Sequence, residues 1–119
     1  MGMLAKQLAD EVGGYERNKV TVQIGKEEIT IYAKPLTGAD LDNLMRRHPK
    51  FAEAPTLGAT CDLLISKCEN EAGDKIFDVG DKPLLLRMDL SKINRIRREL
   101  FPDQDVDLTD AAVDEEMGN

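Results

Sequence analysis

The 119-residue chain contains no tryptophan, one histidine and two cysteines, and only 4% of its residues are aromatic. Aliphatic side chains must therefore form its hydrophobic core, and a site that stacks on sugars or bases is not expected. With a single histidine, no nucleophile can be assigned to a general base. The chain also lacks a glycine-rich phosphate loop and the spaced acids of a calcium-binding loop. We expect a protein that is not an enzyme and that uses no metal or other cofactor.

No stretch of the chain approaches the ~18 apolar residues that a membrane-spanning helix requires. The segment MGMLAKQLAD has no apolar core of the signal-peptide kind, and Lys6 stands where a myristoylation signal has serine or threonine. Cys61 and Cys68 lie in a helical pattern that would separate their Cα atoms by ~10 Å, too far for a disulfide. These features predict a cytoplasmic protein without membrane contact, whose cysteines are buried in the core.

Charge is distributed unevenly along the chain. All 16 lysine and arginine residues and all but seven of the 23 acidic residues lie before residue 103, so the final stretch carries the whole net charge of −7. Residues 103–119 are therefore expected to be disordered in the free protein. They form either a solubilising end or a segment that becomes ordered on a partner. The acids concerned are Asp103, Asp105, Asp107, Asp110, Asp114, Glu115 and Glu116.

Residues 1–16 predict an amphipathic helix. Leu4, Leu8 and Val12 recur at four-residue spacing, and a glycine pair follows that would end the helix. A helix this short needs a docking partner, which is either the body of this chain or another protein.

Residues 17–102 are expected to form one α+β domain. Apolar and polar residues alternate in residues 20–24 and again in 29–33, which predicts an antiparallel hairpin with one buried face. Helical periodicity follows, and we expect four or five helices to pack against this small sheet. The predicted helix caps are Thr37, Thr56, Asp81 and Ser91.

Each predicted helix of the domain carries an apolar stripe that is expected to face the core. The inward residues are predicted to be Leu41, Leu44 and Met45, then Leu57, Cys61, Leu64, Ile65 and Cys68, and finally Ile93, Ile96 and Leu100. His48 is expected at a helix C-terminus, where a cation complements the helix dipole, with a titrating or ligand role as the alternative. A basic cluster is expected to be a solvated helix face, with contact to nucleic acid or to an acidic segment as alternatives; it comprises Lys92, Arg95, Arg97 and Arg98.

The hairpin KVTVQIGKEEITI leads directly into the junction Pro35, Leu36, Thr37, Gly38, Ala39, Asp40 and Leu41, and the segment PLLLRMDLSKINRIRREL ends the domain. Over about residues 18–101, this order resembles the tail assembly chaperones of long-tailed bacteriophages. In that family a two-stranded element passes through such a junction into a helix, followed by a further helix and a terminal helix pair.

The resemblance implies a protein of the host bacterial cytoplasm that binds the tape measure protein transiently, keeps it soluble and aids polymerisation of the tail tube. It also implies absence from the finished virion. The tail tube protein would be a second partner, recruited by a longer product of −1 ribosomal frameshifting. The codons of Met117, Gly118 and Asn119 permit a slippery heptamer, although an ordinary stop codon would end the chain equally well.

Candidate partner-binding residues, which the core could equally use, are Leu4, Leu8, Val12, Leu84, Leu85 and Leu86. Neither nucleic acid nor a membrane is expected as a partner, and the oligomeric state stays open. One alternative is a structural phage protein, such as a tail completion or connector subunit, which would form rings and remain in the virion. A second alternative is an acidic mimic of nucleic acid, which the confinement of the excess charge to the tail disfavours.

Overall fold

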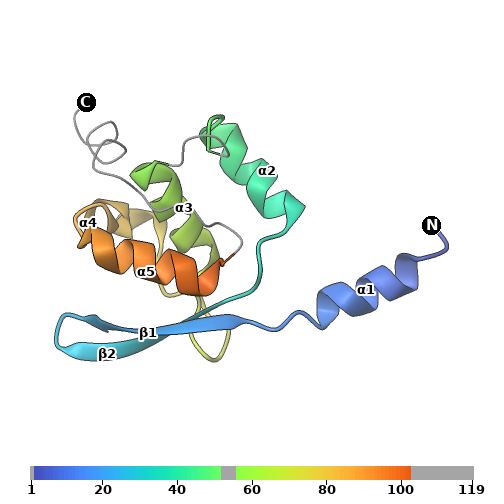
Figure 1. Ribbon diagram of the computed structural model, residues 1–119, viewed down its shortest axis with the longest axis horizontal. Helices are drawn as coiled ribbons and strands as arrows, with labels where there is room; N and C mark the ends of the chain where they lie inside the picture. Colours follow the sequence, from blue (N-terminus) through green and yellow to red (C-terminus); the bar gives the residue numbers. More distant parts are fainter. Residues whose placement is uncertain (1, 52–55, 103–119) are drawn as a thin grey trace.

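The computed structural model describes residues 2–51 and 56–102 (Figure 1). Within them, its elements are α1 (Ala5–Gly13), β1 (Asn18–Ile24), β2 (Glu27–Ala33), α2 (Gly38–Arg47), α3 (Leu57–Lys67), the 3-10 turn η1 (Val79–Asp81), α4 (Lys82–Leu85) and α5 (Leu90–Leu100). A two-stranded antiparallel sheet and five α-helices confirm the predicted α+β class. The acidic tail that we expect at residues 103–119 lies outside the described residues.

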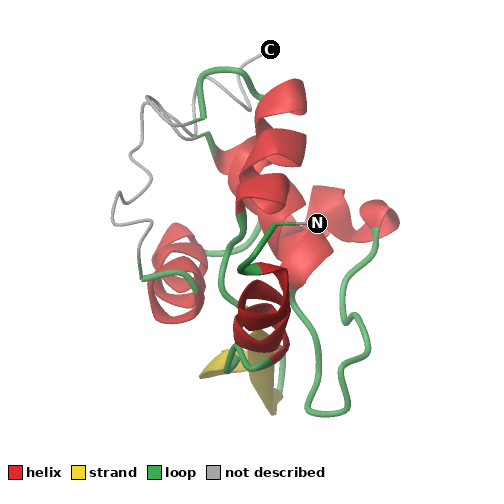
Figure 2. Ribbon diagram, turned by 90° about the vertical axis from the view of Figure 1, so that its right-hand side faces the viewer, coloured by secondary structure: helices red, strands yellow, loops and turns green. Residues whose placement is uncertain are grey.

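The hairpin forms as its alternating pattern predicts. Val20 pairs with Ile31, and both side chains point into the core, where they are 5% and 0% exposed. On the opposite face, the hydroxyl groups of Thr21 and Thr30 lie 2.9 Å apart across the strands. The two-residue turn begins with Gly25, whose φ of 65° is accessible to glycine at no steric cost. Figures 1 and 2 place the helices of the body on one side of this hairpin.

The central helix of the body is α3, in which seven of the 11 residues are buried. Helix α5 runs antiparallel to β1 along its length: Asn18 Nδ2 donates to the Leu100 carbonyl over 2.9 Å at one end, and Lys92 Nζ donates to the Gln23 carbonyl at the other. The main core cluster comprises Val20, Val22, Ile31, Ala33, Leu44, Phe51, Ala59, Leu63, Leu64, Cys68, Ile96, Leu100 and Phe101. A smaller cluster joins α3 to α4 and α5 and comprises Leu57, Cys61, Leu85 and Ile93.

Two of the four predicted caps are confirmed. Thr37 Oγ1 accepts from the Asp40 amide over 3.1 Å, and the Asp40 carboxylate accepts from the Thr37 amide over 2.9 Å, which completes a capping box at α2. Thr56 caps α3 by accepting from the Ala59 amide over 3.2 Å. Both threonines have an extended backbone, as an N-cap requires.

The other two predicted caps are wrong. Asp89 rather than Ser91 caps α5, because its carboxylate accepts from the Ser91 amide over 2.8 Å. Asp81 does not cap α4, since the helical turn begins earlier, at η1. There Asp78 is the cap, and the Asp81 carboxylate accepts from the Asp78 amide over 2.9 Å.

Two predictions of side-chain orientation are also wrong. Met45 is 38% exposed, because α2 packs at the edge of the body and only Leu44 among its residues is buried. Arg97 is 2% exposed rather than solvated. It stands four residues after Ile93 and three before Leu100, so it falls on the inward face of α5. Arg95 is exposed, as predicted.

Both cysteines are buried and carry free thiols. Burial, together with the nearby Glu69 carboxylate, raises the pKa of the Cys68 thiol to about 12. The thiol is therefore neutral at physiological pH and behaves as a small apolar side chain, which confirms the predicted core role.

Candidate partner-binding surface

Helix α1 projects from the body (Figure 1) and carries an exposed apolar stripe. None of its nine residues is buried. The side chains of Leu4, Leu8 and Val12 are 62%, 57% and 59% exposed. At roughly 100° and 1.5 Å per residue, they lie within a sector of about 80° and span about 12 Å along the helix. The stripe is thus a continuous apolar surface that does not pack on the body.

Several features make α1 weak as a helix on its own. The residue at its N-cap is Leu4, which makes no capping hydrogen bond. Lys6 lies in the first turn and Asp10 and Glu11 near the C-terminal end, so these charges oppose the helix dipole. Isolated helices shorter than ~12–15 residues are marginal in water. A contact along the stripe would stabilise α1 more than its own sequence does.

Arg17 fixes the chain immediately after α1. Its guanidinium donates to Glu69 Oε1 over 3.0 Å and to the carbonyls of Asn70 and Glu71 over 2.9 Å each. It also lies 4.6 Å from the centroid of the Tyr32 ring, a cation–π distance. Only three residues separate this anchor from the end of α1. The helix is therefore tethered closely to a rigid point of the body.

The other candidate partner-binding residues do not join this surface. Leu84 is 65% exposed, Leu85 is 3% exposed and belongs to the core, and Leu86 is half-buried against the smaller core cluster. Helix α4, which carries Leu84 and Leu85, lies at the opposite end of the molecule from α1 (Figure 1). A run of three leucines cannot indicate which of them faces outward in so short a helix.

The residues of the family junction have structural roles. Leu36 and Leu41 pack against the main core cluster. Lys67 of α3 lies 2.7 Å from Asp40 Oδ2 and 3.4 Å from the Pro35 carbonyl, so the junction also fastens α2 to α3. Burial alone would raise the pKa of Asp40, but hydrogen bonds from Lys67 and from the amide and hydroxyl of the capping threonine outweigh it and hold that pKa below its ordinary value.

A second polar contact joins three helices of the body. The Asp62 carboxylate lies 2.8 Å from His48 Nε2 and 3.1 Å from Lys82 Nζ, which connects the end of α2 and the start of α4 to α3. Burial would raise the pKa of Asp62, but these two hydrogen bonds outweigh it and lower that pKa. The sequence predicts only the helix-end position of His48 and gives no sign of Asp62 or Lys82 as its neighbours.

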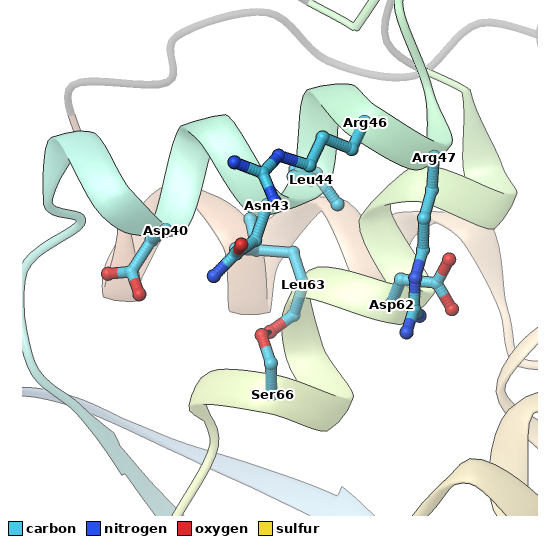
Figure 3. A pocket seen from close by; sticks show the side chains of 8 residues that line it. All are labelled: Asp40, Asn43, Leu44, Arg46, Arg47, Asp62, Leu63 and Ser66. Atoms are coloured by element: carbon cyan, nitrogen blue, oxygen red, sulfur yellow. Dashed lines mark hydrogen bonds between the residues drawn. The ribbon is translucent and has the colours of Figure 1, made fainter.

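A groove of about 400 Å³ lies between α2 and α3 (Figure 3). Asp40 lies toward one end of it in this view, and Arg47 and Asp62 toward the other. Its lining comprises Asp40, Asn43, Leu44, Arg46, Arg47, Asp62, Leu63 and Ser66. An adjoining groove of about 500 Å³ shares three of these residues and is further lined by Ile65, Lys75, Ile76, Phe77, Asp78 and Val79. The Asp40 carboxylate is held in an ion pair with Lys67, and the Asp62 carboxylate in one with Lys82.

Among residues 2–51 and 56–102, no cluster of histidine, cysteine and carboxylate side chains has the composition of a metal site. Within the same ranges, no helix has both the length and the apolar character needed to cross a bilayer. No family model matches the chain, and neither a curated protein nor a solved structure matches it. Function is therefore inferred from the surface of the chain itself.

Proposed function

We propose that this protein is a non-enzymatic tail assembly chaperone of a long-tailed bacteriophage, and that it binds the tape measure protein through α1. The family in this proposal rests on the resemblance of the hairpin and of residues 35–41, and the observation that carries the choice of binding surface is the exposed stripe of Leu4, Leu8 and Val12 on a helix that projects from the body. A tape measure protein is long, helical and rich in apolar stripes, and it would aggregate until the tail tube encloses it. A short amphipathic helix can cover such a stripe until the tube subunits arrive.

The size of the stripe fits a transient contact. Full burial of a leucine or valine side chain stabilises by about 1.5–3 kcal/mol. The three side chains are about 60% exposed in the free protein, so their burial contributes roughly 3–5 kcal/mol in total. Burial of the partner's own apolar stripe contributes a similar amount, and association itself costs at least about 4 kcal/mol. One α1 helix therefore binds weakly and reversibly, and several copies along one tape measure protein would be needed to keep it soluble.

The proposal also specifies the compartment in which the protein acts and the stage of tail assembly at which it leaves. The protein acts in the cytoplasm of the host bacterium and leaves before the virion is complete. Its acidic residues 103–119 keep the complex soluble, since they carry the whole net negative charge of the chain. In a longer −1 frameshift product, the same residues link the chaperone domain to a second domain that recruits the tail tube protein.

Co-expression with the tape measure protein of the same phage tests the proposal. With the wild-type chain, most of the tape measure protein is expected in the soluble fraction. With a triple variant, in which Leu4, Leu8 and Val12 are all changed to serine, most of it is expected in the insoluble pellet. Leu84→Ser is the matched control, because it removes an equally exposed leucine from the opposite end of the molecule.

Equal solubility with the triple variant and the wild type would refute the assignment of α1. Recovery of the protein from purified virions, in rings, would instead favour a structural tail completion or connector subunit.

A further inference from the structure

The charges around the apolar stripe of α1 are unevenly placed. Lys6 and Asp10 are four residues apart and fall on the face opposite the stripe, where they neighbour each other. Glu11 lies about 60° around the helix from Leu8 and borders the stripe. Glu16 follows in the linker to β1, and both glutamates are exposed. The stripe therefore has a negatively charged border toward the C-terminal end of α1.

No base in the described part of the chain neutralises this border. Arg17 is the nearest cation in sequence, but its guanidinium is held by Glu69 at 3.0 Å, with 26% of the Arg17 side chain and 18% of the Glu69 side chain exposed. Lys6 points away from the stripe, as its position on the helix requires. A partner that buries the stripe must consequently face Glu11 across the contact, where an unpaired charge is costly and a cation is favourable.

We infer that the surface covered by α1 is an amphipathic helix whose apolar stripe is bordered by lysine or arginine. This inference rests on the proposed function and specifies the segments of the tape measure protein that α1 recognises. The contact combines burial of Leu4, Leu8 and Val12 with ion pairing at Glu11. Segments whose stripe is bordered by acids bind more weakly, because like charges would meet at the edge of the contact.

A second copy of this chain does not fit as the occupant. An antiparallel pair of α1 helices would bring the two Glu11 carboxylates to the same side of the shared stripe, without a cation between them. A stable interface also needs about 20–30 residues from each side, whereas α1 contributes nine. A foreign helix with a basic border supplies the cations that a second copy lacks, and its contact with α1 is transient.

Binding of synthetic peptides to the full-length protein tests the inference. Two peptides of about 20 residues carry the same leucine stripe at helical spacing, one bordered by lysine and the other by glutamate. Fluorescence anisotropy at low salt is expected to show about tenfold tighter binding of the lysine peptide. The difference is expected to shrink at about 1 M salt, where the screening length is only ~3 Å.

Glu11→Lys is expected to reverse the preference, so that the glutamate peptide binds more tightly. Glu28→Lys is the matched control, since it makes the same charge change at another exposed glutamate, near the turn of the hairpin, and is expected to keep the wild-type preference. Equal affinity for both peptides, binding of neither, or the same response from the two variants would overturn the inference. Sedimentation of the protein alone as a dimer that Leu8→Asp dissociates would also overturn it.

The inference and the proposed function fail separately. One outcome is that Glu11→Lys leaves the peptide preference unchanged while the tape measure protein still becomes insoluble with the triple serine variant. In that case α1 binds the tape measure protein, but the charge of Glu11 does not determine which segments it binds. If the triple serine variant keeps it soluble, the proposed function fails, whatever the peptides show.

Discussion

Replacement of Asp62 by alanine removes a side chain that connects three helices of the body. Its carboxylate contacts His48 at 2.8 Å and Lys82 at 3.1 Å, and the side chains are 13% exposed for Asp62, 21% for His48 and 28% for Lys82. A hydrogen bond to a charged group contributes about 1.5–3 kcal/mol, and the partial exposure of both partners places each contact near or below the lower limit. Alanine also stabilises α3 by about 0.5 kcal/mol relative to aspartate, because its helix propensity is higher.

The free energy of unfolding is therefore expected to fall by about 2 kcal/mol in Asp62→Ala. For a chain of this size, that corresponds to a decrease in Tm of roughly 8–16 °C. Asp42→Ala is the matched control: Asp42 also pairs with a base, Arg46, at 3.0 Å on the same helix, but the two side chains are 64% and 75% exposed. Its loss is expected to cost no more than about 0.5 kcal/mol.

Urea unfolding of the full-length protein, followed by circular dichroism with m-values compared between variants, measures both changes. A loss in Asp62→Ala no larger than that in Asp42→Ala would refute the reasoning, because it would show that the buried contact contributes no more than a solvated ion pair.

Three further outcomes are expected. The pKa values of Asp40 and Asp62 are lowered below the ordinary 3.8 in the folded protein. The two carboxylates therefore stabilise the fold above that pH, and this contribution is lost as the pH falls through their folded pKa values. Acid titration of the wild type should show a fall in stability below about pH 4, and Asp62→Asn should reduce that fall. Cys68, 0% exposed and with a pKa of about 12, should react with a thiol reagent only after urea unfolding. Leu64→Ala should cost about 2–5 kcal/mol by urea unfolding, whereas Leu8→Ala on the exposed stripe should stay within about 0.5 kcal/mol.

Local patterns predicted those parts of the fold that local physics determines. The alternation in the hairpin follows from one buried and one solvated face, and the threonine caps follow from orphan amides at a helix start. The prediction that Arg97 is solvated rests on its charge alone and is wrong, since the residue is buried. Its spacing from Ile93 and Leu100 already indicated the inward face of α5.

Contacts between segments that lie far apart in the sequence leave no local pattern in it. The pairing of Asp62 with Lys82 spans 20 residues and depends on how α4 packs against α3, which no periodicity encodes. The stripe of α1 was visible in the sequence, but its exposure was not. The same three apolar residues would suit a helix docked on its own body.

Site-specific photo-crosslinking in cells that also produce the tape measure protein tests the central claim most directly. A photoreactive residue at position 8 is expected to give a covalent product with the tape measure protein, because Leu8 is at the centre of the exposed stripe. The same residue at position 21, on the exposed face of the hairpin, is expected to give none. A product from position 21 without one from position 8 would show that the hairpin, rather than α1, binds the partner.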